Sequence, residues 1–396
     1  MSVVKTLVLL NSLVFAFSLL GVSLVFLFTP LLVSIVYLIK GKKTVKYYTS
    51  HPSISLITVV HNAEDFIVDK IKNYLSLNYP SDDYEIIIFS DGSTDGTEKN
   101  VTHFTDKKVR LLSSAKHEGK NASINKAVEN CSGEIIIFSD VGGILEPNAV
   151  LNLVKHFTDS EVGGVCGEMI IYKNSIELEK AQSVYIKFSN LIKKLESQIG
   201  SISSNNGALF AFRRRLFKHI PLAVTDDLFQ CMSIVKQNYR FIYEPDARVF
   251  IKARAKGSSH EIQRRRRVVA RSLRGIYLKK GVLNPFKYGV FSLNLLINKI
   301  VRRLLPVSLL LIFSSSLFLS FYNPYIKIIL FLQIAFYLLA FSYWTLFQYI
   351  PHLRIVTRTA STAYYFCLGN YGTLLGLIDF LRGIKIEKWE PIKEDR

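Results

Sequence analysis

The sequence predicts an α/β domain with a mostly parallel sheet, flanked by apolar helices that are long enough to cross a membrane. The domain is predicted by short β-rich runs that alternate with periodic helical runs between residues 50 and 286, a pattern typical of a parallel sheet with helices on both faces. The flanks are predicted by long uncharged stretches in a chain whose residues are 49% hydrophobic. We therefore expect three parts: residues 1–49 as a transmembrane helix with a basic flank, residues 50–286 as the α/β domain, and residues 287–396 as interfacial and transmembrane helices with a tail.

The elements of the α/β domain alternate along the chain. We expect strands at residues 55–60, 84–90, 109–114, 134–139 and 162–171. We expect helices at residues 64–77, 96–104, 120–129 and 147–157. A domain of roughly 235 residues is large enough to bury a core of its own.

An uncharged stretch rich in Leu, Val and Phe covers residues 7–39. Roughly twenty apolar residues span a bilayer, so we predict a transmembrane helix; the stretch is too long for the apolar part of a cleaved signal peptide. Lys40, Lys42, Lys43 and Lys46 follow at once. Because basic flanks favour the cytoplasmic side, we expect the α/β domain in the cytoplasm and the protein in the inner or plasma membrane.

The C-terminal part contains apolar stretches at residues 304–322, 325–347 and 359–380. We predict that the first two cross the membrane as a pair. The third carries several polar residues, and the tail after it is basic. We therefore expect the third stretch to lie shallow or re-entrant, which keeps the tail in the cytoplasm.

The formal net charge of +19 implies an acidic partner. Basic residues gather between Lys252 and Lys280, beside the membrane segments, with Glu261 as the acid among them. Such clusters attract anionic lipid, so the expected partner is the lipid bilayer. A membrane-tethered nucleic-acid-binding protein is the alternative, but the sequence carries no signature of a nucleic-acid recognition module, and we expect no nucleic-acid partner. The four cysteines form no Cys-x-x-Cys pair, which argues against a zinc site or a disulfide framework.

Acidic residues follow two β-rich runs of the same sequence. The run from Glu85 to Asp91 is repeated from Glu134 to Asp140. Each run places a carboxylate at the carboxyl end of a strand, the edge at which open α/β sheets bind ligands. A third acidic cluster, Thr225-Asp226-Asp227, opens a later helix. This arrangement suits an enzyme that handles a nucleotide-linked substrate.

Several motifs follow one another in the order typical of one enzyme family. They are Val59-Val-His-Asn-Ala-Glu64, the Asp91-Gly-Ser-Thr-Asp-Gly turn, Gly119-Lys120 with Asn125, Asp140, Thr225-Asp226-Asp227, Gln263-Arg-Arg-Arg266 and a closing Trp389-Glu-Pro391. Together they resemble the family 2 glycosyltransferases with a GT-A fold, and most closely the membrane-embedded branch similar to cellulose, chitin and hyaluronan synthases. The resemblance implies a Rossmann-like GT-A domain. It also implies an inverting hexosyltransferase that moves a sugar from a nucleotide-sugar, UDP-linked by expectation, to a glycan acceptor in extracellular or capsular polysaccharide synthesis.

The resemblance places four residues at the donor. Asp91 would accept hydrogen bonds from the base or ribose, and Lys120, at a helix start, would reach the diphosphate. Asp140 matches the first acid of Asp-x-Asp, which binds the diphosphate through Mg²⁺ or Mn²⁺. Glu64 lies near the nucleotide in relatives, although a first-turn carboxylate favoured by the helix dipole explains it equally well. The alternatives are a turn-forming role for Asp91, which we prefer for Asp95, and a solvated surface position for Lys120.

The later motifs concern the acceptor and the chemical step. Thr225-Asp226-Asp227 aligns with Thr-Glu-Asp of the family, in which the last acid is the general base. Asp227 is therefore the expected base, with Asp226 beside it in the catalytic pair and Thr225 as a helix N-cap. Asn206 and Gly207 belong to a polar stretch that lines the acceptor site in relatives, although any surface loop could have this composition.

Gln263, Arg266 and Arg267 match the Gln-x-x-Arg-Trp motif of the processive synthases. Helical spacing places the three on one face, and the resemblance implies that they contact the donor diphosphate. Contact with anionic lipid is the alternative for these basic residues, and we expect Arg266 toward the diphosphate and several of its neighbours toward lipid.

The chain departs from the family pattern at two positions. Gly142 stands where the second acid of Asp-x-Asp is usual, which weakens the expectation of a metal cofactor. Arg267 replaces the Trp that stacks on a growing sugar chain, which weakens the expectation of processive synthesis. A single-sugar transferase that acts on a lipid-linked acceptor is the main alternative. A catalytically inactive relative is another, but Asp91, Asp140 and Asp227 argue against it.

Overall fold

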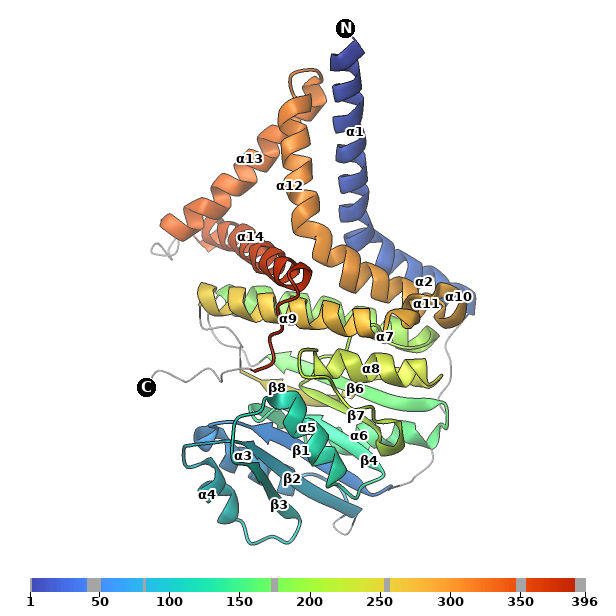
Figure 1. The fold of residues 1–396 in the computed structure, drawn as a ribbon, viewed down its shortest axis with the longest axis vertical. Helices are drawn as coiled ribbons and strands as arrows, with labels where there is room; N and C mark the ends of the chain where they lie inside the picture. The colour runs from blue at the N-terminus through green and yellow to red at the C-terminus, as the bar shows by residue number, and fades with distance from the viewer. Residues whose placement is uncertain are drawn as a thin grey trace.

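The computed structural model describes residues 2–40, 51–80, 83–171, 177–252, 257–346 and 354–388. The predicted basic flank at Lys42, Lys43 and Lys46 and the closing Trp389-Glu-Pro391 lie outside these residues. Figure 1 shows the sheet in the lower half of the molecule, a layer of long helices above it, and further helices that rise away from that layer.

One eight-stranded sheet forms the core of the domain in the described residues. Its strands are β1 (Ile54–Val60), β2 (Tyr84–Asp91), β3 (Val109–Ser114), β4 (Ile135–Ser139), β5 (Gly143–Leu145), β6 (Val162–Ile171), β7 (Leu209–Arg213) and β8 (Arg240–Ile251). They lie in the order β3-β2-β1-β4-β7-β6-β8-β5. The pairs β1–β2, β1–β4, β2–β3 and β6–β8 are parallel, and the other three are antiparallel. The predicted mostly parallel α/β sheet is confirmed, although β5 and β8 were not predicted from the sequence.

The helices of the domain follow the predicted alternation. They are α3 (Glu64–Leu75), α4 (Thr97–Thr102), α5 (Lys120–Glu129), α6 (Ala149–Val154), α7 (Glu177–Ile199), α8 (Asp226–Lys236) and α9 (Ser258–Leu278). Short 3₁₀ turns at Lys155–Thr158, Arg214–Leu216 and Lys280–Leu283 complete the domain.

Both faces of the sheet are buried, because alternate residues of a strand point to opposite faces. In β1, Leu56 and Val60 belong to one apolar cluster, which includes residues of α3 and α6. Ile57 and Val59 belong to the other cluster, which includes residues of α5 and α8. The continuous apolar composition of β1, β2 and β4 follows from this double burial.

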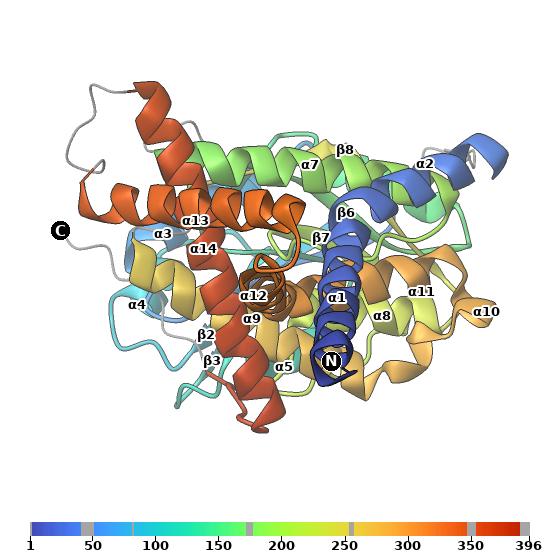
Figure 2. The same cartoon turned by 90° about the horizontal axis from the view of Figure 1, so that it is seen from above.

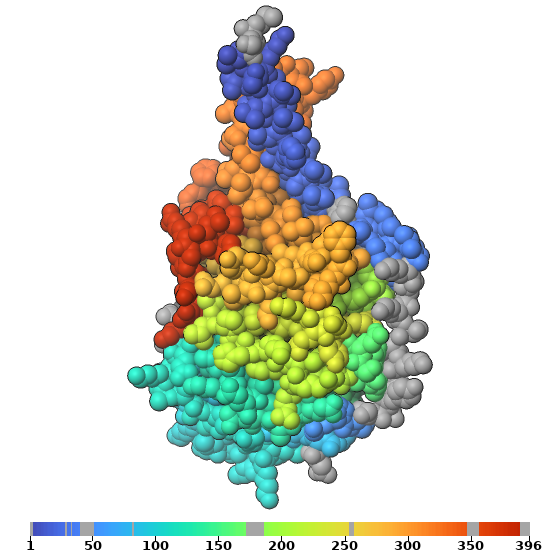
Figure 3. Space-filling model, turned by 45° about the vertical axis from the view of Figure 1, so that its right-hand side comes forward, coloured from blue at the N-terminus to red at the C-terminus, as the bar shows by residue number. Residues whose placement is uncertain are grey.

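The remaining helices lie outside the sheet domain. They are α1 (Ser2–Ser23), α2 (Thr29–Lys40), α10 (Pro285–Tyr288), α11 (Val290–Leu295), α12 (Arg302–Leu319), α13 (Pro324–Thr345) and α14 (Arg354–Leu381), with π-helical turns at Leu24–Phe28 and Leu296–Val301. Seen from above, α13 and α14 cross over the helical layer, and α1 stands beside α12 (Figure 2). The space-filling view shows that α1 and α12 form a narrow stalk on the rounded domain (Figure 3).

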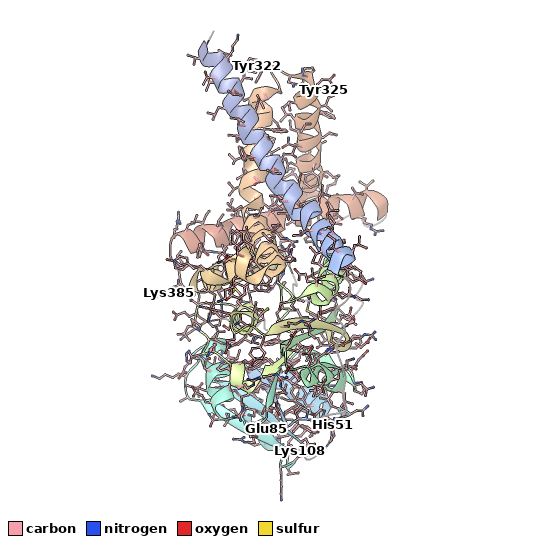
Figure 4. All side chains as sticks on the ribbon, turned by 90° about the vertical axis from the view of Figure 1, so that its right-hand side faces the viewer. His51, Glu85, Lys108, Tyr322, Tyr325 and Lys385 are labelled. Carbon is pink, nitrogen blue, oxygen red and sulfur yellow. The ribbon has the colours of Figure 1, made fainter. Side chains whose placement is uncertain are left out.

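Two segments of the described chain are long and apolar enough to cross a membrane, Val3–Leu27 and Pro324–Thr345. The predicted span at residues 304–322 is helix α12, which packs against α1 and α13. Tyr322 and Tyr325 lie at the far tip of the stalk, at the opposite end from Glu85 and Lys108 (Figure 4). Their position fits the preference of tyrosine for a membrane–water interface.

The predicted shallow stretch at residues 359–380 forms most of α14. Figure 1 shows this helix lying along α9 rather than rising with the stalk. Close packing is possible because Gly372 and Gly376 of α14 meet the backbone of α9 at Ile262 and Arg266. A side chain on either glycine would force the two helices apart.

Candidate active site

The carboxyl ends of the central strands converge on one edge of the sheet. Asp91 ends β2, Asp140 follows β4, and the two strands flank β1. Asp226 reaches the same edge from the first turn of α8. A small pocket at this edge is lined by Ile57, Val59, Lys120, Ile124, Phe138, Ser139, Asp140, Gly207 and Asp226. The structure thus brings five of the residues predicted from the sequence, Asp91, Lys120, Asp140, Gly207 and Asp226, to one edge.

Lys120 lies between two carboxylates. Its Nζ is 3.0 Å from Asp140 Oδ1 and 3.3 Å from Asp226 Oδ2. Burial alone would lower the pKa of Lys120, but Asp140 and Asp226 together raise it above its ordinary value. Gly119, with φ +100°, turns the chain so that Lys120 begins α5. A fixed ammonium at a helix N-terminus is suited to a phosphate group.

Asp227 is half-buried and lies beside this cluster. Its Oδ1 accepts a 2.7 Å hydrogen bond from the backbone N–H of Leu228. Burial, with the charge of Asp226, raises the pKa of Asp227 to about 6. A carboxylate whose pKa lies near neutral pH is suited to general-base chemistry.

The predicted acceptor stretch approaches Asp227 at Gly207. Gly207 has φ +66°, and a Cβ at this position would lie 3.3 Å from Asp227 Oδ2. The Asn206 side chain holds the stretch in place, because its Nδ2 donates to Gly167 O at 2.7 Å and its Oδ1 accepts from Ala208 N at 3.1 Å. Gly207 thus leaves room next to Asp227, while Asn206 fixes the backbone.

Asp91 is fully buried, and both of its oxygens are used by the protein. Oδ1 accepts from Glu118 N at 2.8 Å and from Ser114 Oγ at 3.3 Å. Oδ2 accepts from Gly119 N at 2.9 Å and lies 2.9 Å from His117 Nδ1. In this structure the carboxylate holds the turn that leads into α5, and its predicted contact with the donor remains a prediction.

Glu64 also serves a neighbouring turn. Its Oε2 accepts from Gly96 N at 2.9 Å, and its own N–H donates to Asp95 Oδ2 at 3.2 Å. Asp95 Oδ1 in turn accepts from Thr97 N and Oγ1. These bonds are consistent with a turn-forming role for Asp95. Glu64 lies in the first turn of α3, the position at which the helix dipole favours a carboxylate.

The two arginines of the basic motif on α9 that were predicted to contact the diphosphate have different neighbours. Arg266 forms a paired interaction with Asp379 of α14, with Nη2 2.8 Å from Oδ1. Asp379 is 3% exposed, so it needs a counter-ion, which Arg266 supplies. In this structure Arg266 is paired with Asp379, and its predicted contact with the diphosphate remains a prediction. Gln263 is exposed.

Arg267 is the next residue of α9 after Arg266, and it lies close enough to Arg271 to feel its charge. Burial, with the charges of Arg271 and Arg264, lowers the pKa of Arg267. Arg271 donates to Val224 O at 2.9 and 2.6 Å, and it lies close enough to Asp226 and Asp227 to feel their charges. Arg267 is therefore a neighbour of Arg271, which in turn lies near Asp226 and Asp227.

Sequence reasoning missed the basic residues that surround the acids. In the sequence, nothing distinguishes Arg271 from the other residues of its basic run, or Lys299 from the other basic residues near the membrane segments. The Nζ of Lys299 donates to Ser204 Oγ at 2.6 Å. Its positive charge lowers the pKa of Asp227, against the larger effects of burial and Asp226. Neither residue carries a local signal, because only the packing of α9 and the turn before α12 brings them to the site.

A buried lysine lies beneath the Asp140 turn and was also missed. Lys70 of α3 is 0% exposed, and its Nζ donates to Ser139 Oγ at 2.8 Å and to Gly143 O at 2.5 Å. Burial lowers the pKa of Lys70 to about 7, against the opposing effect of Asp140. A lysine on an amphipathic helix ordinarily predicts a solvated position, so the sequence pointed away from this arrangement.

The residues at the edge fit a divalent cation that is shared with phosphates. Asp140 and Asp226 direct carboxylate oxygens at one position, which the Lys120 ammonium occupies. In the described part of the chain, no group of three or more His, Cys, Asp or Glu side chains could hold a metal. Such a site suits Mg²⁺ or Mn²⁺, which take one or two carboxylates together with phosphate oxygens and water, and it is not a cage formed by protein ligands alone.

Residues 55–221 match the family model described as glycosyl transferase family 2. The chain is 25% identical over 201 residues to the poly-beta-1,6-N-acetyl-D-glucosamine synthase of Staphylococcus epidermidis, which covers 49% of this chain and 48% of that protein. It is 25% identical over 186 residues to the UDP-Glc:alpha-D-GlcNAc-diphosphoundecaprenol beta-1,3-glucosyltransferase WfgD of Escherichia coli, covering 47% of this chain and 70% of that protein. The matched region thus spans about half the length of the synthase.

The fold has a counterpart among solved structures. The mannosyltransferase PcManGT from Pyrobaculum calidifontis, in complex with GDP-Man and Mn²⁺, superposes with a TM-score of 0.68 at 19% identity. The match covers 94% of this chain and 100% of that chain. At this identity the similarity establishes the GT-A fold, and it extends over the helices outside the sheet domain.

Proposed function

We propose that this family 2 glycosyltransferase, an enzyme that takes its sugar from a nucleotide-sugar, transfers that sugar with inversion to a glycan acceptor in extracellular or capsular polysaccharide synthesis. The observation that carries the proposal is the convergence of Lys120, Asp140 and Asp226 on one position, with Asp227 directly beside it. This geometry separates a cationic position suited to a diphosphate from a carboxylate suited to proton removal.

The donor would bind with its diphosphate at the N-terminus of α5. Lys120 supplies a positive charge there, and the free N–H groups of the first helical turn point the same way. Asp140 and Asp226 would hold a Mg²⁺ or Mn²⁺ ion, which when bound lowers the charge on the departing nucleotide. Asp91 would contribute indirectly, because it holds the turn at which α5 starts.

The transfer step would use Asp227 as the base. Its carboxylate takes the proton of an acceptor hydroxyl as that oxygen forms a bond to the anomeric carbon. The bond between the anomeric carbon and the diphosphate oxygen breaks on the opposite side, and the electron pair leaves with the nucleoside diphosphate. An α-linked donor therefore gives a β-linked product. The raised pKa of Asp227, about 6, makes the carboxylate a better proton acceptor than an ordinary aspartate while leaving it ionised at neutral pH.

Polysaccharide synthesis is supported by the similarity to a poly-N-acetylglucosamine synthase and by the apolar helices beside the domain. Addition of a single sugar to a lipid-linked acceptor is the second candidate. It is favoured by the similarity to WfgD, whose name gives a diphosphoundecaprenol-linked acceptor, and by Arg267, which provides no aromatic platform for a sliding chain.

The donor and the product length can be tested together. Purified membranes are incubated with a panel of UDP- and GDP-sugars, and release of the nucleoside diphosphate is measured against the Asp227→Asn variant. We expect release with one donor and chains of many sugars that a β-specific glycosidase degrades. Addition of only one sugar at any donor excess would select the second candidate, and no release with any donor would contradict both.

We further propose that the sheet domain faces the cytoplasm of a cell whose inner or plasma membrane holds the apolar helices. Cys131, Cys166 and Cys231 are buried, so a labelling test needs an introduced thiol. Lys107→Cys places one at an exposed position of the domain. We expect a membrane-impermeant maleimide to label it only after the cells are opened. Labelling in intact cells would show that the sheet domain faces outward and would contradict the proposal.

A further inference from the structure

Lys70 is a fully buried cation directly below the turn that carries Asp140. Besides its bonds to Ser139 Oγ and Gly143 O, its Nζ lies 4.4 Å from the centre of the Tyr74 ring. Tyr74 is itself held by a 2.7 Å hydrogen bond to Thr58 Oγ1, which donates to Ser139 O at 2.9 Å. The ammonium is therefore fixed by β1, α3 and the turn at once.

Burial of the Lys70 ammonium costs solvation free energy, and nearby groups must offset that cost. An ammonium group taken out of water loses more solvation than hydrogen bonds to neutral oxygens restore, unless a negative charge lies nearby. Its contacts are two neutral oxygens and an aromatic face, and the charge that acts on it is that of Asp140. Lys70 and Asp140 thus form a pair that is coupled through the 139–143 turn without direct contact.

The same turn has a free position at Gly142. A Cβ added to Gly142 would meet nothing within 4 Å, so the backbone does not require glycine for lack of space. The turn therefore has one carboxylate at its surface and one ammonium beneath it, in place of two carboxylates at its surface.

We propose that Lys70 is a positioning residue whose buried charge offsets Asp140, so that the 139–143 turn attracts the donor diphosphate and holds divalent metal weakly before the donor arrives. The proposal rests on the proposed function, because it assigns the diphosphate of a nucleotide-sugar to this edge. Glycine rather than a carboxylate at residue 142 and the buried charge of Lys70 then have the same electrostatic effect, because each makes the turn less negative.

Two ligands test this effect separately. Mn²⁺ alone is titrated against the full-length protein and free Mn²⁺ is measured by electron paramagnetic resonance. UDP and GDP are titrated in excess EDTA by calorimetry. Both are done at pH 6.5, where Lys70 is largely protonated. Lys70→Met removes the buried charge, and Gly142→Asp adds a surface charge to the same turn.

We expect Lys70→Met to bind Mn²⁺ about tenfold more tightly and to bind the nucleoside diphosphate in EDTA about tenfold more weakly, as for one unit charge removed at short range. Gly142→Asp should shift both affinities in the same directions, and the double variant should shift them further. A lysine that only fills space would give weaker diphosphate binding, with and without metal alike, and no gain in Mn²⁺ affinity.

Lys193→Met is the matched control. Lys193 is 4% exposed, donates to Asn190 Oδ1 at 3.1 Å and lies 5.5 Å above the Tyr243 ring. It therefore resembles Lys70 in burial and contacts but belongs to α7, away from the turn. We expect it to lower the melting temperature to a similar extent without changing either affinity. If Lys70→Met does not fold, Lys70→Gln keeps a hydrogen-bond donor and removes the same charge.

Unchanged Mn²⁺ and diphosphate affinities in a folded Lys70 variant would overturn the proposal. If wild-type protein binds neither UDP nor GDP under any condition, the proposed donor fails instead, and the Mn²⁺ titration still decides the effect of Lys70. The two failures are therefore distinguishable.

Discussion

The two strand-end aspartates have the same six residues before them and opposite surroundings. Asp91, at the end of β2, is 0% exposed and accepts hydrogen bonds from a turn that closes over it. The Asp140 side chain, just after β4, is 37% exposed and faces Lys120. Identical sequence has therefore produced a carboxylate that holds the fold and a carboxylate that is available to a ligand.

The difference comes from what lies next to each strand. β2 pairs with the parallel strand β3, so the 115–119 segment that follows β3 arrives at the same edge and covers Asp91. Gly92, with φ +63°, makes this possible, because a Cβ there would lie 2.4 Å from the backbone N of His117. β4 pairs on its outer side with the antiparallel strand β7, which starts at this edge after Gly207 and leaves Asp140 open.

The protein groups around an acid therefore indicate its role better than its sequence motif does. Asp227 extends the series, since burial and Asp226 raise its pKa while Leu228 N provides a hydrogen bond. We therefore expect Asp91, which is surrounded by donors, to stabilise the fold, Asp140, which faces a cation, to bind a ligand, and Asp227, whose pKa is raised, to accept a proton. Each assignment can be broken by a substitution.

The largest effect is expected at Asp227. Asp227→Asn removes the proton acceptor but keeps the shape, so kcat should fall by roughly a hundredfold or more, with binding of the nucleoside diphosphate nearly unchanged. Steady-state kinetics and calorimetry measure the two quantities. Retention of more than about a tenth of the wild-type turnover would remove Asp227 from the role of base, given the usual size of such effects.

The two strand-end acids should separate stability from binding. Asp91→Asn leaves buried N–H donors facing an amide NH₂, so it should lower the free energy of unfolding by about 2–4 kcal/mol. Asp140→Asn should cost less stability than Asp91→Asn, although it removes a negative charge that acts on Lys70 and Lys120. It should also weaken donor binding in the presence of Mn²⁺ by about tenfold or more and reduce the stimulation of activity by Mn²⁺. Thermal melts and donor titrations of both variants provide the measurements. If both variants lost stability equally, the contrast between the two ends would fail.

The pH profile should follow Asp227. Its pKa is raised to about 6, and the base must be ionised, so kcat should rise with pH through about 6 and level off above it. The Asp227→Asn variant should lack this rise in its residual activity. A profile that rises near pH 4, the ordinary range of an aspartate, would show that Asp227 is not raised in the working enzyme.

The smallest effect is expected from Ser114. Its 3.3 Å bond to Asp91 Oδ1 is the longest of those that hold the carboxylate, so Ser114→Ala should cost about 0.5–1 kcal/mol and leave donor affinity unchanged. Melting temperature and donor titration measure this directly. A loss as large as that of Asp91→Asn would mean that the surrounding bonds act as one unit rather than separately.

Much of the fold followed from local patterns. The buried strands β1, β2 and β4 and helices α3 and α5 were predicted nearly to the residue, because continuous apolar runs and helical periodicity reflect burial that is already encoded locally. Strands β5 and β8 were not, because β5 has three residues and β8 is interrupted by charged and proline residues whose pairing depends on distant partners. Thr359 to Phe380 showed its polar character in the sequence, but not that it packs on α9.

From the sequence alone we could predict the candidate site residues: Asp91, Asp140 and Asp227, and the basic motif on α9. The contacts of each side chain became clear from the folded structure. In it Arg266 pairs with the buried Asp379, and Lys70 lies beneath the Asp140 turn. A motif fixes spacing along one element, whereas burial, pKa and charge pairing depend on what other elements bring within a few ångströms, and those contacts join residues far apart in the chain.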